Sequence, residues 1–267
     1  MSDFDRNAAA AQYGAPLTRA EAAVVDEGLR AYMLRIYNYM VLGLAITGFA
    51  ALGIYMLSVT SDPTLAYQGA RPLARGMYLT QLGYYLFASP LKWVVILAPL
   101  GLVFFLSFRI QNMRPATAQI TFWIYAALVG VSLASIFLIY THSSITRVFF
   151  ITAASFGALS LWGYTTNRDL TGMGSFLIMG LFGIIIASLV NVFLGSTMMQ
   201  FVISVVGVLV FAGLTAYDTQ RLKSEYIYGA MDGEVMERSA IMGALSLYLD
   251  FLNLFTMLLQ LLGSRDE

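Results

Sequence analysis

Long apolar runs separated by short polar stretches repeat along the chain after its first 31 residues. Each run holds about 20 mostly apolar residues, which is the length that a helix needs to cross a bilayer. The pattern predicts seven membrane-spanning helices, at residues 34–58, 91–109, 117–140, 147–167, 172–194, 198–219 and 241–262. Polar residues interrupt the last run, so a re-entrant hairpin is the alternative interpretation there. We therefore expect an all-α, polytopic membrane protein.

The polar stretches give the remaining organisation. Residues 1–31 carry both signs of charge and lack the apolar run of a signal peptide, so we expect a polar cytoplasmic arm before a transmembrane domain at 32–264. Residues 59–90 form a long, tyrosine-rich connection on the extracytoplasmic side. Within it, Pro72–Tyr85 is either an ordinary loop or an amphipathic helix on the outer surface.

The charges in the connections predict the orientation. With the N-terminus inside, ten of the 15 Lys and Arg residues lie on the cytoplasmic side and five on the other. Cytoplasmic connections carry an excess of Lys and Arg, so this difference favours a cytoplasmic N-terminus. Arg265 to Glu267 are then outside if the last run crosses the membrane.

Composition supports a membrane protein and narrows its chemistry. The chain is 59% hydrophobic and 11% charged, against about 25% charged residues in soluble domains. Its net charge is zero and it has no basic cluster, so we expect no nucleic-acid partner. The absence of cysteine excludes disulfides and zinc–thiolate sites, and the single histidine, His142, excludes a histidine-based metal site. We expect no cofactor.

Two aspartates stand out within these apolar runs. Asp250 is the only charged residue between Arg238 and Arg265, and Asp218 ends the preceding run. An ionised carboxylate in mid-membrane costs roughly 2.5–3.5 kcal/mol on insertion scales, so such a group needs a partner. One interpretation is that the two acids meet and share one proton. The other is that water satisfies Asp218 while a hydroxyl or amide satisfies Asp250.

Further polar residues lie in the same span as Asp250 and at the end of the second span. Ser246, Asp250 and Asn253 share one helical face, with Gln260 two turns further on, so the last span has a polar stripe. Arg109, at the cytoplasmic end of the second span, is either a cationic partner of one aspartate or an anchor that sets orientation.

Three classes of function follow from these residues. One is an ion pathway lined by the aspartates, and another is a membrane-embedded regulator that binds a partner through its helices or its N-terminal arm. The third is an intramembrane aspartyl protease, because Tyr217 and Asp218 match the first half of that motif. The second half requires Gly-x-Gly-Asp, whereas Asp250 follows bulky residues. We therefore expect no enzymatic activity.

Two segments resemble one known family. "AYDTQRLK" (216–223), followed by "ALSLYLDFLNLFTMLLQLLG" (244–263), is similar to the signature of the Bax inhibitor-1, or transmembrane Bax inhibitor motif, family. The segments "LVGVSLASIFLIY" and "NVF" fit the same pattern. The resemblance covers roughly residues 30–263.

The resemblance implies a fold and an activity. The fold has seven helices, with the last one central among the other six. Asp218 and Asp250 match the di-aspartyl pH sensor of the family, and Arg109 matches the arginine that latches it. The implied activity is a pH-sensitive calcium leak, with calcium ions bound only transiently by the two aspartates. Some bacterial members instead bind and restrain a membrane-bound quality-control protease. We therefore expect a multi-pass protein of the bacterial inner membrane, in contact with lipid, calcium ions and protons.

Overall fold

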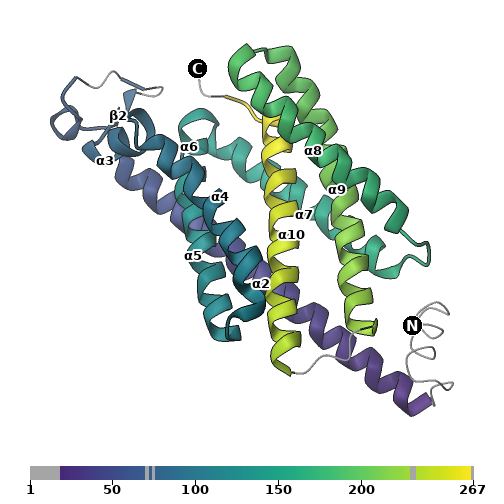
Figure 1. Ribbon diagram of the computed structural model, residues 1–267. Helices are drawn as coiled ribbons and strands as arrows, with labels where there is room; N and C mark the ends of the chain where they lie inside the picture. Colours follow the sequence, from purple (N-terminus) through teal and green to yellow (C-terminus); the bar gives the residue numbers. More distant parts are fainter. Residues whose placement is uncertain (1–18, 70–71, 74–75, 229–232, 266–267) are drawn as a thin grey trace. The chain divides into compact units, whose positions relative to one another are not determined.

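The computed structural model describes residues 19–69, 72–73, 76–228 and 233–265, and most of these are helical (Figure 1). Seven segments are long and apolar enough to cross a membrane. They are α2 (Arg19–Ser58), α4 (Lys92–Arg109), α5 (Pro115–Leu133) with the short α6 (Ile136–Ile139), α7 (His142–Thr165), α8 (Thr171–Leu194), α9 (Thr197–Tyr228) and α10 (Gly233–Leu262). The predicted all-α, polytopic fold is confirmed.

Several helices extend beyond the apolar runs that predicted them. α9 continues past residue 219 to Tyr228, and α10 starts at Gly233 rather than at residue 241. Leu222 and Ile227 are buried in the extension of α9, so packing continues after the apolar run ends. In the first turns of α10, Glu234 and Arg238 form an ion pair at 3.8 Å with i,i+4 spacing, which supports a helix outside an apolar environment.

The chain forms two compact units. Unit 1 contains Met1–Met40 and Arg147–Leu262, and therefore the first part of α2, α7 from Arg147 onward, and α8 to α10. Unit 2 contains Val41–Thr146 and Gly263–Glu267, and therefore the rest of α2 with α4, α5 and α6. In unit 1, α8 packs against α9 and α9 packs against α10.

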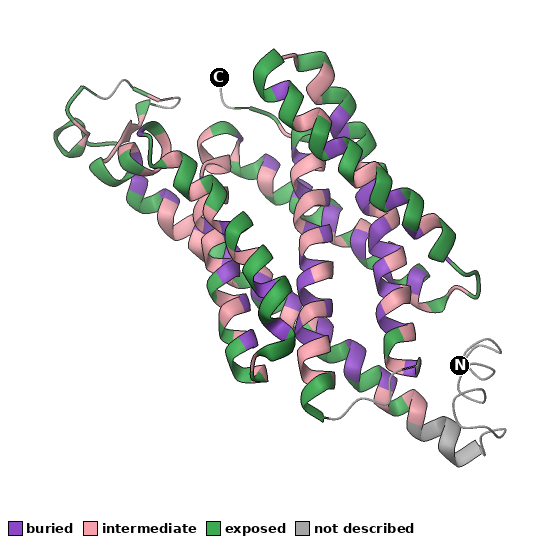
Figure 2. Cartoon of the chain, viewed as in Figure 1, coloured by how far each residue is buried: buried purple, intermediate pink, exposed green. Residues whose placement is uncertain are grey.

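The last helix has buried residues along most of its length (Figure 2). These residues are Ala240, Ile241, Gly243, Ala244, Leu245, Leu247, Tyr248, Asp250, Phe251, Leu254, Phe255 and Leu259. They face several directions around the helix axis, which is typical of a helix enclosed by others. Its position in the centre of all six other spans stays a prediction.

Glycines allow α7 and α8 to approach the polar segment of α9 closely. A Cβ atom on Gly163 of α7 would overlap the backbone carbonyl of Ala216, and one on Gly174 of α8 would overlap the ring of Tyr217. Small residues at such positions are a common means of packing helices in membranes.

Unit 2 shows the same kind of packing between α2 and α5. A Cβ atom on Gly130 would lie 2.5 Å from the carbonyl oxygen of Thr47. The hydroxyl of Thr47 donates a hydrogen bond to the carbonyl oxygen of Ala126 at 2.9 Å, and α4 packs against α5.

The long connection at 59–90 contains a small sheet rather than one amphipathic helix. Strand β1 (Val59–Thr60) pairs antiparallel with β2 (Tyr78–Leu79), and a 3₁₀ turn, η1 (Pro63–Leu65), lies between them. The short α3 (Gln81–Gly83) and the π-helical η3 (Tyr84–Ala88) follow. The helix considered for Pro72–Tyr85 is therefore wrong, although residues 74 and 75 of that range lie outside the described residues.

The seventh span is one unbroken helix. Its 30 residues correspond to about 45 Å at a rise of 1.5 Å per residue, which exceeds the hydrocarbon core of about 30 Å. After the helix, the carbonyl oxygen of Ser264 accepts a hydrogen bond from the backbone N–H of Thr141 at 3.1 Å, and the N–H of Ser264 donates to the hydroxyl of Ser144 at 2.9 Å. The re-entrant hairpin is therefore wrong.

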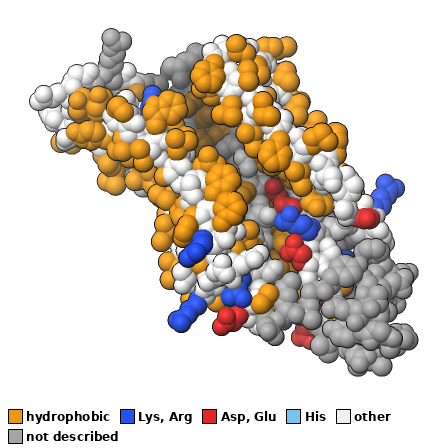
Figure 3. Space-filling view, viewed as in Figure 1, with side chains coloured by type: hydrophobic (Ala, Val, Ile, Leu, Met, Phe, Trp, Pro, Cys, Tyr) orange, Lys and Arg blue, Asp and Glu red, His pale blue; other side chains and the backbone are white. Residues whose placement is uncertain are grey.

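The outer faces of the long helices are apolar. Figure 3 shows hydrophobic side chains spread over them, and Phe193, Phe108 and Phe49 are 89%, 79% and 78% exposed. A soluble domain rarely exposes apolar patches of this extent, whereas lipid chains cover such faces in a membrane protein.

We predict that the two ends of the spanning bundle lie on opposite sides of the membrane. In the cysteine-free chain, Ser264→Cys should react with an impermeant thiol reagent on intact spheroplasts, because the end of α10 is then extracytoplasmic. Asn167→Cys, between α7 and α8, should react only after permeabilisation. Equal reactivity of both positions in intact spheroplasts would contradict this orientation.

We also predict that Gly163→Ala destabilises the protein, because its Cβ meets backbone atoms of α9. Overpacking of this kind costs about 1–3 kcal/mol, which should appear as a lower melting temperature of the detergent-purified protein. Gly157→Ala on the same helix is the matched control, since no atom lies within 4 Å of its added Cβ. Equal melting temperatures for the two variants would refute the close approach of α7 and α9.

Candidate functional site

Two buried carboxyl groups meet between α9 and α10. Asp218 is 8% exposed and Asp250 is 5% exposed, and the two carboxyl groups lie close enough for each to influence the protonation of the other. Two neighbouring carboxylates in a buried site do not both ionise at low cost, so this arrangement favours one proton shared by the two acids. No donor among the described residues reaches Oδ2 of Asp250. The structure thus brings together the two aspartates that the sequence singled out.

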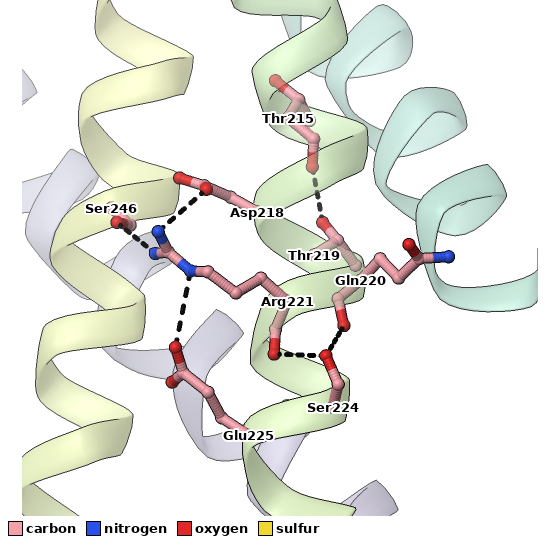
Figure 4. Close-up of polar contacts among 8 residues, drawn as sticks. All are labelled: Thr215, Asp218, Thr219, Gln220, Arg221, Ser224, Glu225 and Ser246. Carbon is pink, nitrogen blue, oxygen red and sulfur yellow. Dashed lines mark hydrogen bonds and ion pairs between the residues drawn. The ribbon is translucent and has the colours of Figure 1, made fainter. Parts of the chain in front are cut away.

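Arg221, one turn after Asp218 on α9, lies beside the Asp218 carboxyl group (Figure 4). Nη1 of Arg221 is 3.4 Å from Oδ1 of Asp218, and its Nε is 3.4 Å from Oε1 of Glu225. Its Nη2 donates a hydrogen bond to Oγ of Ser246 on α10 at 3.2 Å. The guanidinium therefore connects two acids of α9 with a hydroxyl of α10.

Helical spacing explains this arrangement. Asp218, Arg221 and Glu225 are separated by three and four residues, so they follow one face of α9. Ser246 and Asp250 are separated by four residues on the facing side of α10. The sequence analysis missed Arg221 and Glu225, although their i,i+3 and i,i+7 spacing from Asp218 is a signal for them.

Close packing holds α10 against this face of α9. Gly243 lies one turn before Ser246, and a Cβ atom on it would be 2.7 Å from a methyl carbon of Leu222. A larger residue there would have to displace the side chains of Leu222 and Ile36. Side-chain packing therefore holds this interface together with the polar contacts.

Other polar residues of "AYDTQRLK" fasten α9 to the rest of unit 1. The hydroxyl of Thr219 pairs with that of Ser160 on α7 at 2.9 Å, and Ser160 pairs with Tyr37 on α2 at 2.6 Å. The ammonium group of Lys223 donates to the carbonyl oxygen of Tyr164 at 3.1 Å.

Gln220 makes a second kind of attachment, to the connection between α7 and α8. Its Oε1 accepts a hydrogen bond from the N–H of Leu170, and its Nε2 donates to the carbonyl oxygen of Arg168, both at 2.8 Å. Successive residues of the segment thus reach different neighbours, which fixes the rotation of α9 about its axis.

The predicted polar stripe of α10 divides into three parts. Ser246 and Asp250 take part in the site described above. Asn253 donates to the carbonyl oxygen of Leu249 on its own helix at 2.9 Å. At the far end of the helix, Oε1 of Gln260 accepts hydrogen bonds from Nε2 of Gln200 at 2.5 Å and from Oγ of Ser204 at 2.7 Å.

This far-end contact extends to α8. Nδ2 of Asn191 donates to Oε1 of Gln200 at 3.2 Å, and Oδ1 of Asn191 accepts from the N–H of Ser196 at 3.0 Å. We call Asn191, Gln200, Ser204 and Gln260 the amide cluster. It joins α8, α9 and α10 without any charged group.

Arg109, the predicted latch, lies in the other unit. It is an exposed residue at the C-terminal end of α4 in unit 2, whereas both aspartates belong to unit 1. Its pairing with either acid stays a prediction.

Metal binding by the acid pair also stays a prediction. Within the described part of the chain, no three His, Cys, Asp or Glu side chains are grouped closely enough to hold a metal ion.

Comparison with known proteins gives the family. The sequence model of the family described as "Inhibitor of apoptosis-promoting Bax1" matches residues 29–267. The chain is 48% identical to an uncharacterized protein of Rickettsia prowazekii, with 94% of this chain and 96% of that protein covered. An uncharacterized protein of Caulobacter vibrioides is 43% identical over the full length of both chains.

A relative with a more informative name is inner membrane protein YbhL of Escherichia coli. It is 42% identical to this chain over 89% of this chain and 93% of its own length. The family match includes both signature segments and all of the site between α9 and α10. This chain therefore belongs to the Bax inhibitor-1 family.

Proposed function

We propose that this protein is a pH-sensitive leak for calcium ions across the membrane, with Asp218 and Asp250 as its pH sensor. One observation carries the proposal: two buried acids on neighbouring spans lie close enough to influence each other's protonation, which suits a shared proton. The proposed activity is transport and includes no covalent step.

The two aspartates suit transient rather than tight binding of a cation. Calcium prefers oxygen ligands and takes 6–8 of them in a tight site. Two aspartates supply at most four oxygens, so they attract the ion and release it quickly. Conduction needs such weak binding.

A shared proton supports sensitivity to pH. When the pair gains or loses a proton, the charge between α9 and α10 changes by one unit in a low-dielectric environment, and a hydrogen bond between the two acids is made or broken. In this proposal α9 and α10 both line the ion pathway. Gain or loss of the proton therefore changes the charge along the pathway and also its width.

The relatives suggest where the protein acts. The name of the Escherichia coli relative places that protein in the inner membrane, and we propose the same location here. The distribution of Lys and Arg favours a cytoplasmic N-terminus, which puts the end of α9 that follows Asp218 on the cytoplasmic side.

A membrane-embedded regulator is the second candidate function. The description of the matched family names an inhibitor, and a regulator would bind another membrane protein, such as a quality-control protease. The test is reconstitution of the purified protein alone in liposomes loaded with a calcium dye. A calcium flux above that of empty liposomes supports the leak, and no flux at any pH favours the regulator.

We predict that the pH response belongs to the acid pair. Asp218→Asn and Asp250→Asn should each abolish or strongly shift the pH response of calcium flux between about pH 5 and 8, because neither remaining acid has a partner with which to share a proton. Asp250→Asn should reduce the flux more, since Asp250 is the more deeply buried acid. Both variants should fold, because asparagine keeps the shape and is easier to bury than a charge.

Asp169→Asn is the matched control for these variants. The hydroxyl and the backbone N–H of Thr171 hold the pKa of Asp169 below its ordinary value, so this exposed acid is ionised throughout the range tested. Its removal should leave the pH response unchanged. If the shift in the double variant Asp218→Asn/Asp250→Asn equals the sum of the two single shifts, the acids act independently and the shared proton is refuted.

We further predict that Arg109→Ala raises the calcium leak at neutral pH without changing the topology. The reason is that the resemblance assigns Arg109 to a latch that holds the closed state through one of the acids. Arg114→Ala is the control, because Arg114 follows on the same cytoplasmic connection and has no such assignment. The same leak in both variants would leave Arg109 with the role of an orienting anchor.

A further inference from the structure

Three acids of α9 and α10 differ in exposure. The guanidinium of Arg221 lies between the exposed Glu225 and the buried Asp218 (Figure 4). The Glu225 side chain is 42% exposed and that of Arg221 is 38% exposed, whereas that of Asp218 is 11% exposed. Asp250 is buried. A cation that approaches from the exposed end therefore meets Glu225 first, then the Arg221 guanidinium, and only then the acid pair.

The groups around this guanidinium are the ligands that a hard cation prefers. Carboxylate oxygens of Asp218 and Glu225 face it at 3.4 Å, and the hydroxyl oxygen of Ser246 accepts from it at 3.2 Å. Calcium binds carboxylate and other oxygen ligands. The hydroxyl of Tyr32 on α2 lies near Arg221 and Glu225 and bonds to Ser239 of α10 at 3.0 Å. Three helices of unit 1 thus surround one position for a positive charge.

A second observation points to a missing positive charge at this position. Oδ2 of the buried Asp250 has no donor among the described residues, and its carboxyl group lies within electrostatic reach of both Asp218 and Arg221. The contact between Nε of Arg221 and Glu225 also lacks hydrogen-bond geometry. One hydrogen bond, from Nη2 to Ser246, and charge attraction to the two acids hold the guanidinium there, so a cation that binds the same oxygens can replace it.

We propose that Asp218, Glu225 and Ser246 form the entry site for a divalent cation, and that the guanidinium of Arg221 occupies this site as a tethered competitor. The inference rests on the proposed calcium leak and adds the residue that admits or excludes the ion. Glu225 is the outer ligand, and the exposed Arg221 side chain swings out when a divalent cation enters.

The test measures binding of calcium alone to the detergent-purified full chain by isothermal titration calorimetry at neutral pH. Arg221→Gln removes the competing charge, so calcium affinity should rise about tenfold, the effect expected for one unit charge near a partly exposed site. Arg221→Lys keeps the charge and should bind calcium as the unchanged protein does. Adding Glu225→Gln to Arg221→Gln should cancel the gain.

Arg238→Gln is the matched control, because Arg238 also pairs with a glutamate on a neighbouring turn, Glu234 on α10. It should leave calcium affinity unchanged. An unchanged or lower affinity in Arg221→Gln, with the elution profile and melting temperature of the unchanged protein, overturns the proposal. If the double variant Arg221→Gln/Glu225→Gln keeps the higher calcium affinity, Glu225 is not a ligand, and the proposal is overturned as well.

The outcome is separate from that of the proposed function. If liposomes show no calcium flux but Arg221→Gln binds calcium more tightly, the entry site stands and the leak fails. If flux is present and Arg221→Gln leaves calcium affinity unchanged, the leak stands and the entry site fails.

Discussion

The cost of keeping carboxylates away from water governs the arrangement of α9 and α10. Neither Asp218 nor Asp250 has enough exposure for water to stabilise its charge, and each helix alone would carry this cost. Contact between the two acids lowers it, because one proton then serves both and Ser246 and Arg221 add further polar partners. The two helices consequently stabilise each other at the point where each is least suited to lipid.

The rest of unit 1 supports that contact. Thr219, Gln220 and Lys223 attach α9 to α7 and to the connection before α8. Gly163 lets the backbone of α7 approach that of α9, and Gly243 leaves room for the side chains of Leu222 and Ile36. An acid pair needs side chains placed within a few tenths of an ångström, and a helix held at successive residues by different neighbours provides that precision.

The sequence predicted the spans well because about 20 apolar residues are a strong requirement of the bilayer. It misplaced the ends of α9 and α10, where packing and ion pairs continue a helix beyond the apolar run. Asp218 and Asp250 were recognisable because charges are rare within spans. Arg221 was not recognised, because an arginine after an apolar run is also what orientation in the membrane requires. The small sheet at 59–90 was missed as well, since two-residue strands leave almost no alternation in a sequence.

The two ends of the α9–α10 interface differ in kind. At one end the contacts are between acids and a guanidinium, and at the other they are between the amides and hydroxyls of the amide cluster. Amide and hydroxyl groups keep the same protons across the physiological range, so a change of pH leaves the far end joined while it alters the near end. A proton therefore changes the polar contacts around Asp218 and Asp250, while the amide cluster keeps the register of the two helices at the opposite end of the interface.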